Sequence, residues 1–176
     1  MTVQKAIRYL QGRQDPHLGA WYGRWGVNYI YGTSAALVGL LAVGEDVGRP
    51  YIQKALGWLK SVQQPDGGYG ETTASYQDKS LAGQGVVTPT QTAWALLALI
   101  SAHEGHGSEA QKAAQYLVSH FDKNDAWTDP SVVGTGHRRA VYVEYPSYSK
   151  AFTLDALAKF LKDRDTPSYE PRRFRK

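Results

Sequence analysis

The sequence contains no cysteine, which excludes disulfides and thiolate-bound metals and permits a reducing compartment. It also lacks a long hydrophobic run, because the longest, residues 35–43, is far shorter than the roughly 20 residues of a membrane-spanning helix. The first residues, Met1 to Lys5, do not have the pattern of a secretory leader. These three absences together predict a cytoplasmic protein.

Acidic and basic residues nearly balance, giving a net charge of +4, and much of the basic excess lies near the C-terminus. We expect residues 163–176 to form a disordered basic tail, because chain ends are rarely held down. The alternative is contact of this tail with anionic lipid headgroups, which would place the protein at the periphery of a membrane. No basic stripe is interleaved with aromatic residues, so nucleic-acid binding is not expected.

Aromatic residues, in contrast, are plentiful at 12 % of the chain, with 12 Tyr and 5 Trp. Their rings supply apolar area for a core and electron-rich faces that attract cations. Hydrophobic residues make up 42 % of the 176, enough for one folded domain with its own core. The five histidines have no ligand-like spacing, so no metal site is expected.

One pattern recurs three times, beginning at Lys5, Lys54 and Lys112. In each copy an aromatic residue and a leucine follow four and five positions after the lysine. Each copy opens as an amphipathic helix and ends at polar residues, most clearly at the turn formed by residues 64–68. The copies therefore predict three units of one supersecondary structure.

A second helix is expected in each unit. Thr33 and Ser34 are suited to cap a helix over residues 35–43, Thr88 and Pro89 to open one over 91–102, and Ser149 or a residue nearby to open the last. No strand pattern persists along the chain. The predicted fold class is all-α, with about six helices arranged as helix-hairpin repeats in a single domain of residues 1–162.

The three copies resemble the QW motif of squalene-hopene and oxidosqualene cyclases, in which a glutamine, a glycine and a tryptophan follow the first helix. The matching positions are Gln14 and Trp21, Gln63 and Tyr69, and Trp127, while Phe121 replaces the third glutamine. The resemblance implies a structural role for these residues, in which the glutamine and the ring tie the end of one helix to its neighbour.

Residues 21–33, 51–56 and 88–96 are similar to segments of bacterial squalene-hopene cyclases, and the resemblance covers residues 1–162. It implies about half of an (α/α)6 barrel of the terpenoid cyclase type. It also implies an isomerase of triterpenoid biosynthesis that takes an apolar polyprene such as squalene and needs no cofactor. In that family an aspartate of an Asp-x-Asp-Asp motif protonates the terminal double bond, and aromatic faces stabilise the resulting cation.

This sequence contains no Asp-x-Asp-Asp motif, so no catalytic residue is expected on it. The resemblance carries over six positions at or near the substrate chamber: Trp25, Tyr31, His137, Val141, Tyr145 and Tyr148. His137 and Val141 both stand where the family commonly has phenylalanine, and valine offers no π face. Two roles stay open for His137, an exposed loop residue or a chamber residue that acts as a base.

Two functions follow as alternatives. The chain is either the C-terminal half of a cyclase, completed by a second half-barrel polypeptide that carries the acid, or a non-catalytic module. Such a module would bind an apolar ligand or a protein, with a homodimer as one form. In either case half a barrel leaves an apolar inner face in need of a cover. The third interpretation is a fragment, either the product of a decaying gene or a piece excised from a longer protein.

Overall fold

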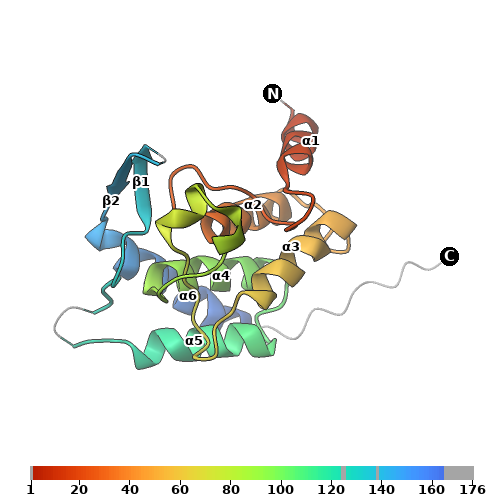
Figure 1. The fold of residues 1–176 in the computed structure, drawn as a ribbon. Helices are drawn as coiled ribbons and strands as arrows, with labels where there is room; N and C mark the ends of the chain where they lie inside the picture. The colour runs from red at the N-terminus through yellow and green to blue at the C-terminus, as the bar shows by residue number, and fades with distance from the viewer. Residues whose placement is uncertain (1, 124–125, 138, 165–176) are drawn as a thin grey trace.

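The computed structural model describes residues 2–123, 126–137 and 139–164. Within these ranges it has six α-helices: α1 (Val3–Arg13), α2 (Tyr29–Ala42), α3 (Pro50–Ser61), α4 (Pro89–Ser101), α5 (Ser108–Ser119) and α6 (Pro146–Arg164) (Figure 1). They confirm the predicted all-α class and the three helix hairpins. The tail predicted for residues 163–176 begins inside α6, and from residue 165 onward it lies outside the described residues.

The helices form two layers, with α2, α4 and α6 as an inner layer and α4 between the other two. Ten of the thirteen residues of α4 are buried, so this helix is covered on nearly every side. That matches its sequence, which is apolar or uncharged all round, as expected of a fully buried helix. The core includes leucines of α2, α3, α4 and α5 that have almost no exposed surface.

The first residues of the inner helices test the predicted caps. Thr88 caps α4 as predicted, because its Oγ1 accepts a hydrogen bond from the Gln91 N–H (3.1 Å). The prediction for α2 is wrong, since this helix begins at Tyr29 and Thr33 lies buried inside it. The Thr33 hydroxyl instead accepts from the Trp21 N–H (3.0 Å). The last helix begins at Pro146, three residues before the predicted Ser149.

Distant carboxylates cap two of the inner helices. Glu71, in the loop before α4, accepts hydrogen bonds from the backbone N–H groups of residues 28, 29 and 30 at the start of α2 (3.3, 3.1 and 2.8 Å). Asp129, in the loop before α6, accepts from the N–H and the hydroxyl of Thr90 in α4. Each carboxylate lies two residues after the aromatic residue that matches the tryptophan of the QW motif, Tyr69 for Glu71 and Trp127 for Asp129. Each loop therefore caps the inner helix of the preceding hairpin.

Two motif glutamines connect their loops to the next outer helix. Gln14 Nε2 donates to the carbonyl oxygens of Gly19 and of Tyr51 in α3, both at 2.7 Å. Gln63 Nε2 donates in the same way to Gly67 (2.9 Å) and to Glu109 in α5 (2.8 Å). These hydrogen bonds join consecutive hairpins.

The motif rings contact the last turn of the helix before them. Trp21 Nε1 donates to the Leu10 carbonyl, and Trp127 Nε1 donates to the Leu117 carbonyl, both at 2.7 Å. Such bonds satisfy carbonyl groups that a helix end leaves without partners. Tyr69 occupies the same position in the second copy and is fully buried, but its hydroxyl has no hydrogen-bond partner among the described residues.

The long loops contain structure that was not predicted. Two short 3-10 helices, Thr73–Tyr76 and Lys79–Leu81, lie in the loop before α4. The loop before α6 forms an antiparallel hairpin of β1 (Gly134–His137) and β2 (Val141–Val143), seen at one side of the molecule in Figure 1. Backbone hydrogen bonds from Val27 N to Val133 O (2.8 Å) and from Thr135 N to Trp25 O (3.1 Å) hold this hairpin against the segment before α2.

Candidate functional site

A group of five rings, which we call the aromatic cluster, lies where α2, α4 and the start of α6 meet. It consists of Tyr31, Trp94, Tyr145, Tyr148 and Phe152. The Trp94 ring lies at its centre, with its centroid 4.9 Å from Tyr31, 6.4 Å from Tyr148 and 5.6 Å from Phe152, in edge-to-face geometry in each case. Three of the six predicted chamber residues are therefore brought together through a residue of α4.

Tyr145 and Tyr148 form the outer end of the cluster. Their rings are stacked at 4.5 Å with an angle of 19° between their planes, and Tyr148 also meets Phe152 edge to face at 5.2 Å. Tyr145 is partly exposed and Tyr148 is half-buried. The two rings are thus accessible on one side and supported on the other.

Two glycines let the backbone lie directly on these rings. A Cβ atom added at Gly26 would stand 2.6 Å from the Tyr31 ring and 2.9 Å from that of Trp94. One added at Gly134, the residue that Gly26 faces in an isolated β-bridge, would stand 2.6 Å from the Tyr145 ring. The segment before α2 and strand β1 therefore fix the positions of the rings from outside.

The other three predicted residues do not join the cluster. Trp25 lies in the segment before α2, where it is 58 % exposed beneath the Arg24 guanidinium. His137 and Val141 face each other across the β-hairpin, and both are exposed. Of the two roles that the sequence left open for His137, this position corresponds to the exposed one.

The aromatic cluster contains no Asp, Glu, Lys, Arg or His side chain. Burial raises the pKa of the Tyr31 hydroxyl above its ordinary value of 10.0, and the nearby Tyr148 hydroxyl raises it further. Trp94 is 4 % exposed, and its Nε1 has no hydrogen-bond partner among the described residues. Such a surface can offer π faces to a cation but cannot donate a proton to an alkene.

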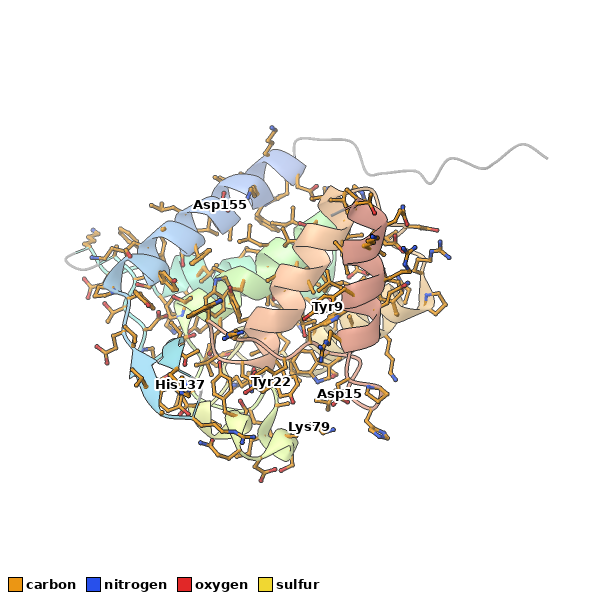
Figure 2. All side chains as sticks on the ribbon, turned by 90° about the horizontal axis from the view of Figure 1, so that it is seen from above. Tyr9, Asp15, Tyr22, Lys79, His137 and Asp155 are labelled. Carbon is orange, nitrogen blue, oxygen red and sulfur yellow. The ribbon has the colours of Figure 1, made fainter. Side chains whose placement is uncertain are left out.

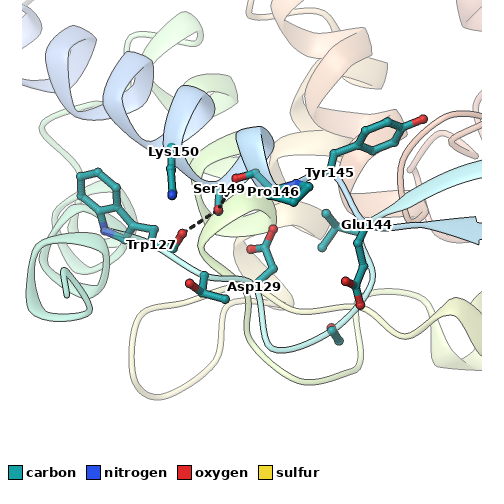
Figure 3. A pocket seen from close by; sticks show the side chains of 10 residues that line it. Trp127, Asp129, Glu144, Tyr145, Pro146, Ser149 and Lys150 are labelled. Carbon is teal, nitrogen blue, oxygen red and sulfur yellow. Dashed lines mark hydrogen bonds between the residues drawn. The ribbon is translucent and has the colours of Figure 1, made fainter. Parts of the chain in front are cut away.

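A cavity of about 250 Å3 adjoins the cluster, between Trp127 and Tyr145 (Figure 3). Asp129 and Lys150 line it, and the hydroxyl of Ser149 donates to the Trp127 carbonyl (2.7 Å) at its edge. Burial raises the pKa of the Asp129 carboxyl, although the two hydrogen bonds from Thr90 oppose the shift. Because Asp129 already caps α4, this cavity is better explained as part of the loop structure than as a reaction site.

Among the described residues, no group of three or more His, Cys, Asp or Glu side chains is arranged to hold a metal ion. None of the helices in residues 2–123, 126–137 and 139–164 is long and apolar enough to cross a membrane.

Trp94 and Phe152 are the two residues of this site that sequence reasoning missed. The sequence predicts each of them only as a member of an apolar helix, because an aromatic residue in such a helix is usually a core residue. The composition of the surroundings offers one indication, namely an excess of aromatics in the segments that flank α2 and α6. Which rings meet there depends on how the three inner helices pack.

Comparison with known proteins gives a consistent result over nearly the whole chain. The sequence model of the family described as squalene-hopene cyclase C-terminal domain matches residues 1–162. The chain is 43 % identical over 166 residues to a probable squalene–hopene cyclase of Sinorhizobium fredii, covering 94 % of this chain and 26 % of that protein. It is 45 % identical over 159 residues to the squalene–hopene cyclase of Alicyclobacillus acidocaldarius, covering 90 % and 25 %.

A relative with a different name matches as well. The chain is 38 % identical over 173 residues to dammaradiene synthase of Dryopteris crassirhizoma, again covering 90 % of this chain and 25 % of that protein. The chain thus spans about a quarter of the length of these relatives.

Proposed function

The chain belongs to the squalene-hopene cyclase family, in which it corresponds to the C-terminal domain, and we propose that it forms one wall of a chamber for cationic polyprene cyclisation. The substrate class is an apolar polyprene such as squalene, as the names of the relatives suggest. The observation that carries the proposal is the aromatic cluster, which gathers Tyr31, Tyr145 and Tyr148 around Trp94.

The cluster suits a carbocation for a simple electrostatic reason. Each ring face attracts a cation by about 0.5–1 kcal/mol when exposed and about 2 kcal/mol or more when water is excluded. A hydrocarbon substrate offers no polar group for a charged side chain to bind, and an ionised carboxylate could trap the cation. Rings that stay neutral therefore stabilise the intermediate without reacting with it.

The proton must come from another part of the protein. No carboxyl group belongs to the aromatic cluster, and the sequence has no Asp-x-Asp-Asp motif. We assign the acid to an upstream segment, either on a separate half-barrel polypeptide or on the same longer chain. Relatives about four times as long have room for such a segment.

A chimera tests this assignment. In the Alicyclobacillus acidocaldarius squalene–hopene cyclase, the quarter matched here would be replaced by this chain, and products from squalene would be identified by gas chromatography and mass spectrometry. We expect cyclic products from the chimera and none from this chain alone. A chimera that melts as cooperatively as the parent enzyme but forms no cyclic product would refute the proposal.

The alternative is a non-catalytic module that binds an apolar ligand or a protein. The exposed positions of His137 and Val141 favour it, since neither supplies a ring face at the aromatic cluster. A folded chimera that retains squalene without converting it would support this function instead.

A further inference from the structure

A side chain near the tip of the β1–β2 hairpin joins the hairpin to the loop before α4. Arg139, in the turn between the two strands, donates a hydrogen bond from its Nε to the backbone carbonyl of Tyr76 (2.9 Å). Tyr76 ends the first of the two 3-10 helices in that loop, 63 residues earlier in the chain. Figure 2 labels His137 in the hairpin and Lys79 on the second 3-10 helix, and the ribbons of the two segments lie side by side there. The bond therefore connects two loops that are far apart in sequence.

The backbone of Arg139 has the left-handed conformation, with a φ angle of 69°. Glycine adopts this conformation freely, whereas a residue with a Cβ keeps it only where its surroundings compensate the cost. Arg139 forms no ion pair with any residue that the structure describes. Its hydrogen bond to the Tyr76 carbonyl is therefore the polar contact that holds the turn in this geometry.

Tyr76 itself contacts both the hairpin and the segment before α2. Its ring is buried and stacks on that of Tyr142 in β2, with a centroid distance of 6.1 Å and an angle of 28° between the planes. Its hydroxyl donates to the carbonyl of Gly26 (2.8 Å). The hairpin, the 3-10 helix and the segment before α2 thus meet at one residue.

This junction continues into the aromatic cluster. Gly26 and Gly134 face each other in a β-bridge, and the backbone of Gly134 lies directly on the Tyr145 ring. Tyr145 also follows the end of β2 by two residues. A displacement of the hairpin would therefore move Tyr145 together with Tyr148, the ring stacked on it at 4.5 Å.

Away from these contacts, the hairpin and the loop before α4 are not closely packed. A cavity of about 210 Å3 opens between them, lined by Thr72, Thr73 and Val86 on one side and by Val132 and Tyr142 on the other. The Tyr142 hydroxyl is buried at this place without a hydrogen-bond partner among the residues described. Because atoms that line a void lose their contacts across it, the position of the hairpin depends strongly on Arg139 and on the stacked rings.

We propose that Arg139 is a positioning residue, which holds the Tyr145–Tyr148 pair in place in the aromatic cluster by joining the hairpin to Tyr76. It acts through the hairpin and not on the substrate. The proposal rests on the proposed function, because it assumes that the ring pair stabilises a cation. If the pair is displaced, a cation formed beside it loses a proton to water and leaves as an alkene with fewer rings. Protonation of the substrate, which takes place elsewhere, should not be affected.

The first test needs no activity and uses the chain of 176 residues. Arg139→Ala and Arg139→Gly both remove the guanidinium, but only glycine relieves the left-handed backbone. Arg8→Ala is the control, because Arg8 is exposed on α1 and its replacement changes the net charge equally. Hydrogen exchange would be followed by NMR at the amides of Thr135 and Val27, which bond the hairpin to the segment before α2.

We expect both amides to exchange about fivefold faster in the two Arg139 variants than in the wild type and the control, since one hydrogen bond that holds the hairpin is lost. Exchange in α4 should stay unchanged. If Arg139→Gly exchanges as slowly as the wild type, the backbone conformation and not the hydrogen bond fixes the hairpin, and the proposal is overturned.

The second test introduces Arg139→Gly and the Arg8→Ala control into the chimera described above. We expect the ratio of products with fewer rings to fully cyclised products to rise roughly two- to fivefold for Arg139→Gly only. The initial rate of squalene consumption and the melting temperature should stay unchanged, which a general loss of structure would not allow.

The outcomes separate this proposal from the proposed function. An unmodified chimera that forms no cyclic product would reject the proposed function and this proposal with it. An active chimera whose product mixture is the same with arginine and with glycine at position 139 would overturn this proposal alone.

Discussion

Replacing Gln63 by alanine should destabilise the fold by an amount that the structure allows us to estimate. The Gln63 amide donates to two backbone carbonyls, one in its own loop and one in α5. Hydrogen bonds of this kind contribute about 1 kcal/mol each, so their loss should cost about 2 kcal/mol. For a domain of this size that corresponds to a fall in melting temperature of roughly 4–8 °C.

The matched control is Gln115→Ala. Gln115 lies exposed on α5 and forms no side-chain hydrogen bond with a described residue, so its replacement should change the melting temperature little. Both variants would be followed by thermal unfolding monitored at 222 nm, a wavelength at which helices dominate. If the two variants have the same melting temperature, the Gln63 side chain does not stabilise the contact between the hairpins, and the structural account of the motif fails.

Two more perturbations follow from side chains in the same loops. Tyr69→Phe removes a buried hydroxyl that has no hydrogen-bond partner in the described part of the chain, so it should raise the free energy of unfolding by about 1 kcal/mol, and a lower melting temperature would contradict this. For the Asp15 carboxyl, burial opposes a lowered pKa, but hydrogen bonds from the Leu18 N–H, the Lys79 ammonium and the His17 N–H outweigh it. A lowered folded pKa means that the stabilisation is present above the ordinary value of 3.8 and is lost as the pH falls through the folded value. In urea titrations the free energy of unfolding of the wild type should therefore exceed that of Asp15→Asn near neutral pH, and this difference should vanish at acid pH. A difference that grows toward acid pH would contradict the lowered pKa.

The hairpins were predictable because their determinants are local. The amphipathic period of the outer helices and the Thr88–Pro89 pair mark helices from neighbouring residues alone. The repeated motif likewise gave the positions of Gln14 and Gln63 before their partners were known.

The features that sequence reasoning missed depend on contacts between distant segments. The start of α2 is set by Glu71, more than 40 residues away, so the local candidates Thr33 and Ser34 were misleading. The β-hairpin begins with the residues Gly-Thr-Gly, which have little strand propensity, and it is held by hydrogen bonds to residues 25 and 27. Trp94 joins the predicted rings only because α4 packs between α2 and α6.

The central claim, that ring faces of this chain stabilise a carbocation, is tested most directly at Tyr148. In the chimera, Tyr148→Phe keeps the π face and Tyr148→Leu removes it, while both remove the hydroxyl. Initial rates of cyclic product formation from squalene would be compared, with melting temperatures measured in parallel. We predict that the phenylalanine variant stays close to the unmodified chimera and that the leucine variant is slower by on the order of tenfold. Equal rates for two folded variants would contradict the account.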